Sequence, residues 1–258
     1  MNIFNIIIEQ KLLEISIQSI KRPIEELKNM ERENPIIDFK SIFKKKEIQI
    51  IPEIKQKLFF KDEYKDKQLV LDIINEYKKN GASSISLLTD NYFFDGSFKF
   101  INEVKKNVKL PILQKDFIIS EYQIYQSYFY GTDAIILIAE LLDYYQLNDY
   151  YNFAKEIGLQ VLIQFHNADS LEKINKINPD LILASSRDMN TMKVNIKYFE
   201  KLYSLLPESA TILVEGGVKT KQDLNYINNL NYKGAIIGTG LMKKENPGKE
   251  FKELLKGK

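Results

Sequence analysis

Short apolar runs recur along this chain, and segments with helical spacing separate them. The run at residues 134–139 is apolar at every position without alternation, which is typical of a parallel strand buried on both faces. Residues 68–80 and 222–230 instead carry apolar residues at the spacing of an amphipathic helix. Runs of the first kind lie at residues 48–54, 84–89, 112–114, 134–139, 160–164, 181–185, 211–215 and 234–238. Such a series of strand–helix units predicts a closed parallel barrel rather than an open doubly wound sheet.

The segment before the first predicted strand, residues 1–45, also contains apolar residues. They predict one or two extra helices packed on the barrel, through Leu12, Leu13, Ile15, Ile20, Ile24 and Leu27. The 258 residues suit one (β/α)8 barrel, and no linker, tandem repeat or low-complexity stretch divides them. We therefore expect an α/β fold, a (β/α)8 TIM barrel forming a single domain over residues 1–258, with residues 1–45 as an N-terminal helical extension.

Composition and charge exclude several classes of function. The 37 basic residues nearly balance the 35 acidic ones, and the lysines are dispersed, so we expect no nucleic-acid partner. The chain has no cysteine and only one histidine, His166, which excludes disulfides, thiolate nucleophiles and cysteine or histidine-cluster metal sites. We expect no metal and no cofactor. No apolar run approaches the roughly 18 residues of a membrane span, and residues 1–11 lack a basic signal-peptide start, so we expect a cytoplasmic protein.

Polar side chains follow the predicted strands at the end where barrel enzymes place their catalytic groups. These candidates are Glu53, Lys55, Lys115, Gln164, Ser185, Arg187 and Glu215. Burial lowers the pKa of a lysine and a nearby carboxylate raises it, so Glu53 or Glu215 would keep Lys55 or Lys115 charged as an acid. The alternative is that these lysines are solvated surface charges. Their position at strand ends favours function, because loops on a rigid scaffold carry it.

Glycines follow the last two predicted strands. Gly216 and Gly217 come after the seventh, and Gly238, Thr239 and Gly240 after the eighth. Barrels commonly bind phosphate at this place through backbone N–H groups. The alternative, that the glycines only allow tight turns, is weakened because two adjacent units share the feature. His166 lies just past the fifth strand, and we interpret this lone histidine as a structural hydrogen-bond donor.

Several stretches of the chain are similar to one family of barrel enzymes. They are residues 86–90, 94–97, 110–119, 122–125, 131–138 and 238–242. On these stretches the chain resembles the indole-3-glycerol phosphate synthases of tryptophan biosynthesis over most of its length. The resemblance implies a lyase without a cofactor. It would close the indole ring of 1-(2-carboxyphenylamino)-1-deoxyribulose 5-phosphate, a phosphorylated small molecule, with loss of CO2 and water.

The resemblance also implies a role for each site residue. Lys115 matches the general acid at the sugar carbonyl, and Lys55 matches the lysine that binds the substrate carboxylate. Glu53 and Glu215 match carboxylates that hold these lysines and substrate hydroxyls. The implied substrate-binding residues are Arg187, Phe94, Phe117, Gln164 and Ser185, and the implied phosphate cradle is Gly216, Gly217, Gly238 and Thr239.

Four places depart from the family pattern. Gln164 stands where the family has a glutamate that works as acid or base, Ser185 replaces an asparagine and Gly216 a serine, and Leu58-Phe59-Phe60 replaces Ser-Pro-Ser. An amide cannot exchange a proton at neutral pH, so other readings stay open. One is a silent family member that binds a phosphorylated ligand or a protein partner, for which other tryptophan-pathway enzymes are candidates. Another is an enzyme for a different phosphorylated sugar.

Overall fold

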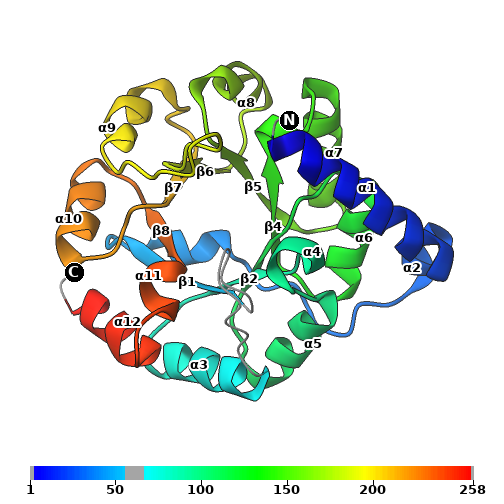
Figure 1. The fold of residues 1–258 in the computed structure, drawn as a ribbon, viewed down its shortest axis with the longest axis horizontal. Helices are drawn as coiled ribbons and strands as arrows, with labels where there is room; N and C mark the ends of the chain where they lie inside the picture. Colours follow the sequence, from blue (N-terminus) through cyan, green and yellow to red (C-terminus); the bar gives the residue numbers. More distant parts are fainter. Residues whose placement is uncertain (1–2, 56–66, 257–258) are drawn as a thin grey trace.

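The computed structural model describes residues 3–55 and 67–256. Eight parallel strands pair in sequence order, and the eighth pairs with the first, so the sheet closes into a barrel. The strands are β1 (Gln49–Ile54), β2 (Ile85–Leu88), β3 (Ile112–Lys115), β4 (Ala134–Ile138), β5 (Gln160–Phe165), β6 (Leu181–Ser185), β7 (Thr211–Glu215) and β8 (Gly234–Ile237). Each lies within one or two residues of a predicted strand, which confirms the (β/α)8 prediction. Figure 1 shows the ring of strands with helices outside it.

Helices cover the barrel from outside. They are α3 (Lys67–Lys79), α4 (Asn91–Phe94), α5 (Phe98–Asn107), α6 (Glu121–Phe129), α7 (Tyr144–Glu156), α8 (Leu171–Ile177), α9 (Tyr198–Leu202), α10 (Lys221–Asn229), α11 (Thr239–Met242) and α12 (Pro247–Leu255). Short 3-10 turns also occur, at η1 (Lys40–Lys44), η2 (Ala139–Leu141), η3 (Ala168–Ser170) and η4 (Tyr203–Leu205). Among the described residues, no helix is long and apolar enough to cross a membrane.

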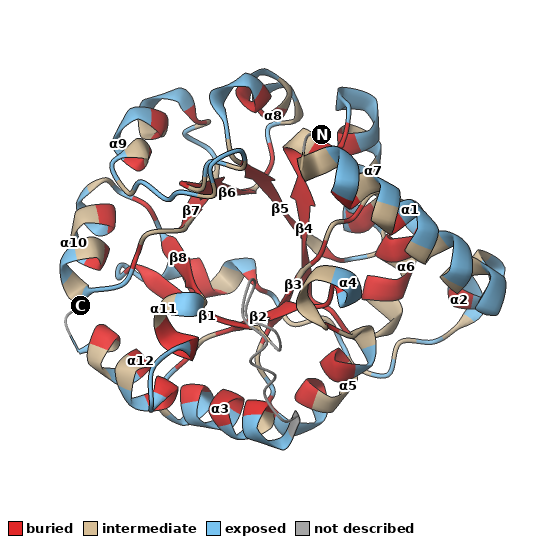
Figure 2. Ribbon diagram, in the orientation of Figure 1, coloured by how far each residue is buried: buried red, intermediate tan, exposed pale blue. Residues whose placement is uncertain are grey.

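The strands are buried on both faces, as their unbroken apolar runs predict. Every residue of β4 is buried, because one face packs in the barrel interior and the other against the helices (Figure 2). Register then aligns the strand ends. Leu88 lies opposite Lys115, and Ser185 lies opposite Glu215. Side chains at these carboxyl ends therefore meet at one mouth of the barrel.

The N-terminal extension contains the helices α1 (Ile3–Lys21) and α2 (Ile24–Asn29), as predicted. The prediction of which residues pack was partly wrong. Leu12, Leu13 and Ile20 are exposed, whereas the buried residues of α1 are Ile7 and Lys11. Apolar residues surround α1 on nearly all sides, so their spacing does not identify the face that contacts the barrel. The departure at Leu58-Phe59-Phe60 lies outside the described residues.

Candidate active site

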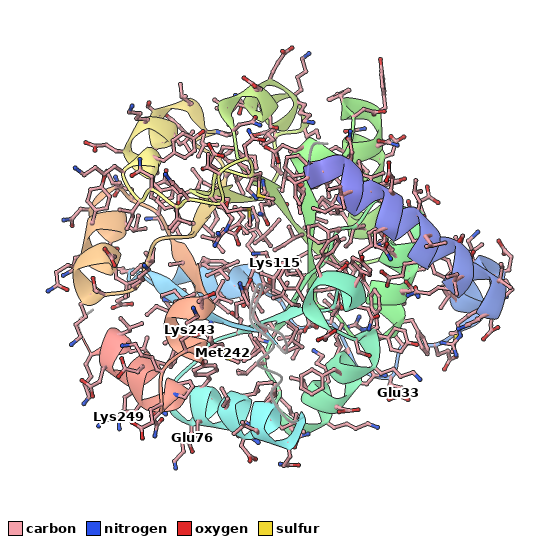
Figure 3. The ribbon with its side chains drawn as sticks, in the orientation of Figure 1. Glu33, Glu76, Lys115, Met242, Lys243 and Lys249 are labelled. Atoms are coloured by element: carbon pink, nitrogen blue, oxygen red, sulfur yellow. The ribbon has the colours of Figure 1, made fainter. Side chains whose placement is uncertain are left out.

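Two carboxylates and one lysine form the centre of the barrel mouth. Lys115, at the end of β3, contacts Glu53 Oε2 on β1 at 3.0 Å and also contacts Glu215 Oε2 on β7. Figure 3 shows Lys115 within the ring of strands. Lys55 approaches the other oxygen of Glu53 at 3.1 Å. The structure therefore brings together the four residues that the sequence predicts as catalytic.

Burial and pairing together set the charges of this cluster. Burial opposes the charge of Lys115, but Glu215 and Glu53 outweigh it and hold the pKa above that of a free lysine. Burial alone would also raise the pKa of Glu53, yet the ammonium groups of Lys115 and Lys55 hold it at about 2. The pKa of Glu215 is likewise lowered, chiefly by Lys115 against the effect of burial. Lys115 therefore carries its positive charge between two ionised carboxylates.

Gln164 joins the central cluster to a second pair of side chains. Its amide nitrogen donates to Glu215 Oε1 at 2.9 Å and lies 3.0 Å from His166 Nε2. His166 Nδ1 lies 3.2 Å from Glu140 Oε2, which comes from η2 after β4. His166 was interpreted from the sequence as a structural donor, but it lines the same cavity as Lys115 and Gln164.

The cavity at the mouth has an apolar side. Its volume is about 300 Å³, and its lining includes Lys55, Lys115, Gln164, Arg187 and Glu215, as predicted. Its aromatic lining residues are Phe4, Phe93, Phe94 and Phe117. The rings of Phe94 and Phe117 lie 6.3 Å apart at 33°. An aromatic ligand would therefore find a hydrophobic wall beside the charged cluster.

The glycines after β7 and β8 line an adjoining cavity of about 260 Å³. Gly216 and Gly217 have positive φ values of 87° and 81°, which only glycine adopts readily. Gly238 is needed for another reason, because an added Cβ would lie 2.5 Å from Glu53 Oε1. Ser185, Arg187 and Thr239 line the same cavity. The predicted phosphate residues are thus brought together, although the local reasons for glycine are turn geometry and close packing.

Sequence reasoning missed a buried ion cluster beside the mouth. Lys11 of α1 contacts Asp90 Oδ2 at 2.7 Å and Asp116 Oδ1 at 2.8 Å, and all three side chains are at most 1% exposed. Asp90 caps α4 and Asp116 follows Lys115, so Lys11 ties the N-terminal helix to two loops of the mouth. Both aspartates follow predicted strands, and Glu140 does too. The strand-end criterion that identified Lys115 could have found all three carboxylates.

The fold and this mouth define a class of protein, a (β/α)8-barrel enzyme with a lysine held between two carboxylates at the mouth of the barrel. The family model described as indole-3-glycerol phosphate synthase matches residues 4–254. The chain belongs to the indole-3-glycerol phosphate synthase family.

Similar proteins cover nearly the whole chain. One indole-3-glycerol phosphate synthase, from Thermoanaerobacter sp. (strain X514), is 38% identical over 92% of this chain and 91% of its own length. Another, from Endomicrobium trichonymphae, is 34% identical over 96% of this chain and 94% of its own. Among solved structures, 3-hexulose-6-phosphate synthase from Salmonella typhimurium has a TM-score of 0.67 at 13% identity, over 81% of this chain and 98% of that one. The structural likeness shows the barrel fold alone.

Proposed function

We propose that this protein is an indole-3-glycerol phosphate synthase in which Lys115 is the general acid. The substrate is 1-(2-carboxyphenylamino)-1-deoxyribulose 5-phosphate, and the products are indole-3-glycerol phosphate, CO2 and water. The observation that carries this proposal is the position of Lys115, a half-buried ammonium between Glu53 and Glu215 on the wall of the cavity at the barrel mouth. Such an ammonium can donate a proton to the sugar carbonyl as the ring carbon attacks it.

The rest of the cavity suits the other parts of this substrate. Phe94 and Phe117 offer a wall for the anthranilate ring, and Lys55 and Arg187 offer cations for its carboxylate. The turns at Gly216, Gly217, Gly238 and Thr239 offer backbone N–H groups to the phosphate. Gln164 and Ser185 would contact the substrate between these ends. We place the enzyme in the cytoplasm, with enzymes that supply its substrate or use its product as candidate partners.

One assay separates this proposal from its rivals. The purified protein is incubated with the carboxyphenylamino-deoxyribulose phosphate, and the indole product is followed by fluorescence. We expect turnover. A protein that binds the substrate without forming indole-3-glycerol phosphate would be a silent family member. A protein that neither binds nor converts it, but converts another phosphorylated sugar, would have a different substrate.

The phosphate cradle has a separate test. Gly217 has a φ of 81°, which a valine rarely adopts, and it lines the cavity. Gly217→Val should therefore shift the local backbone. We expect inorganic phosphate to inhibit the wild-type enzyme competitively and to inhibit this variant at least about tenfold more weakly, because the backbone N–H groups are displaced. Circular dichroism checks that the variant is folded. Equal inhibition of both folded proteins would place the phosphate elsewhere.

A further inference from the structure

The proposed reaction, on which this inference rests, needs a base as well as an acid. After ring closure and loss of CO2, the former carbonyl oxygen is a hydroxyl on the new ring. Loss of water breaks the C–O bond, and the oxygen leaves with a proton supplied by an ammonium. The neighbouring ring carbon, which is bonded to nitrogen, must then lose a proton, and its C–H electron pair forms the ring double bond. Gln164 cannot accept that proton, because a carboxamide is not a base at neutral pH.

We propose that His166 is this base and that Glu140 orients it. Hydrogen-bonding geometry determines which ring nitrogen carries the proton and which has the lone pair. Glu215 Oε1 only accepts, so the nitrogen of the Gln164 amide must face it. The same amide nitrogen lies 3.0 Å from His166 Nε2, so Nε2 accepts there and carries no proton. The proton of the neutral ring is therefore on Nδ1, and it points to Glu140 Oε2.

Glu140 is fixed on its other oxygen by the loop after β5. Its Oε1 accepts from His166 N at 2.8 Å, from Asn167 N at 3.3 Å and from Ser170 Oγ at 3.0 Å. Burial would raise the pKa of Glu140, but its hydrogen bonds and the imidazole lower it, so the carboxylate stays ionised. A buried carboxylate on Nδ1 stabilises the imidazolium that forms when Nε2 takes a proton. Glu140 is therefore a positioning residue with an electrostatic role.

The other titratable groups on the cavity wall are less suited to be the base. Among the described lining residues, Lys55, Lys115, Arg187 and Lys243 are cations. Asp90 and Asp116 are held by Lys11, and Glu215 by Lys115. His166 is a described lining side chain whose neutral imidazole has a nitrogen lone pair for a proton. In the resting site the Gln164 amide occupies that lone pair, but the Gln164 oxygen is buried without a partner, so the amide can turn when substrate binds.

The main test is His166→Gln, assayed with the carboxyphenylamino-deoxyribulose phosphate with hydrogen or deuterium on the methylene carbon next to nitrogen. We expect kcat to fall by about 10²–10⁴-fold with little change in KM, because only a proton transfer is lost. The deuterium isotope effect on kcat should rise, since C–H cleavage becomes rate-limiting. Glu140→Gln should give a smaller loss of the same kind. The matched control is Glu172→Gln, an exposed carboxylate on α8 that pairs with Lys176, and it should change neither value.

The pH profile and a second substitution separate a base from a structural residue. Glu140 and Glu215 face His166, and Arg187, Asp188 and Lys193 share a side cavity with it. We expect wild-type kcat to fall on the acid side and His166→Gln to lose that limb. Adding Gln164→Glu, which supplies a carboxylate, should restore part of kcat to His166→Gln.

Three results would overturn the assignment. The first is a kcat for His166→Gln within threefold of wild type. The second is a loss of rate in His166→Gln with no change in the isotope effect or in the acid limb of the pH profile. The third is no rescue by Gln164→Glu together with full activity in Glu140→Gln. These results leave the proposed function intact, because the wild-type enzyme still forms indole-3-glycerol phosphate. If the wild-type enzyme forms no indole-3-glycerol phosphate, both proposals fail.

Discussion

Two charge clusters lie at opposite ends of the same barrel, and they differ in how fully the protein satisfies their polar atoms. At the amino-terminal end, Asp133 accepts from Ile37 N and Ile112 N and pairs with Lys105 at 2.6 Å and Arg32 at 3.3 Å. At the mouth, Lys115 sits between Glu53 and Glu215 on the wall of a cavity. The first cluster is enclosed by protein, and the second opens toward a ligand.

The pairing of polar atoms distinguishes the charges that stabilise the fold from those that face a ligand. Every oxygen of Asp133 is used by the protein, and its side chain is fully buried, so the cluster closes the strand ends onto the N-terminal segment. The mouth instead contains Gln164, whose buried oxygen has no partner in the protein. A buried polar atom without a partner costs free energy, and a functional site is one reason for a fold to retain it. We therefore expect the Asp133 cluster to control the stability of the fold and the cluster at the mouth to control the rate of the reaction.

The largest expected effect is on rate. Lys115→Met keeps an unbranched side chain but removes the proton donor, so kcat for formation of indole-3-glycerol phosphate should fall by at least about 10²–10⁴-fold. Steady-state fluorescence of the indole product measures it. Lys176→Met on α8, whose partner Glu172 is exposed, is the control and should match wild type. Full activity in Lys115→Met would show that another group is the acid.

At the Asp133 cluster we expect a loss of stability with little change in rate. Asp133→Ala leaves Lys105 and Arg32 buried without their carboxylate, and the free energy of unfolding should fall by about 3–5 kcal/mol. Urea unfolding followed by circular dichroism measures it. At a temperature where the variant stays folded, its kcat should lie within about threefold of wild type. A variant of normal stability with lost activity would contradict the division between the two ends.

The stability of the fold should also depend on pH through Glu53 at the mouth. The pKa of Glu53 is lowered from 4.5 to about 2 in the folded state, so its ionised form stabilises the fold above pH 4.5. That contribution is lost as pH falls from 4.5 toward 2. The free energy of unfolding should therefore decrease more steeply over this range in wild type than in Glu53→Gln. Parallel curves for the two proteins would show that pairing with Lys115 and Lys55 does not hold the charge.

The smallest expected effect concerns a departure from the family. Ser185 is fully buried at the end of β6, and its Oγ accepts from Arg187 N at a long 3.4 Å. Ser185→Asn restores the family residue and adds a donor at the cavity wall, so KM should change only a few-fold while kcat stays near wild type. Substrate titration of the two proteins measures this. A change in kcat above about tenfold would make Ser185 part of the chemistry.

The apolar pattern of the chain predicted the barrel and the candidate residues at the strand ends. Unbroken apolar runs such as residues 134–139 require burial on both faces, and a closed parallel barrel with helices outside provides it. The carboxyl ends of parallel strands meet at one mouth, so Lys115 and Glu215 could be placed together although 100 residues separate them. Periodicity could not show which side of α1 packs, because apolar residues surround that helix.

Which charges meet across the chain depends on the folded arrangement and could not be predicted from local sequence. Lys11 pairs with Asp90 and Asp116, and Glu140 meets His166, through contacts between segments that local sequence does not relate. Burial strengthens such contacts and sets the pKa of each group, and burial is a property of the folded chain. The sequence therefore predicted His166 only as a lone histidine past a strand. The fold placed it on the cavity wall with a carboxylate behind it.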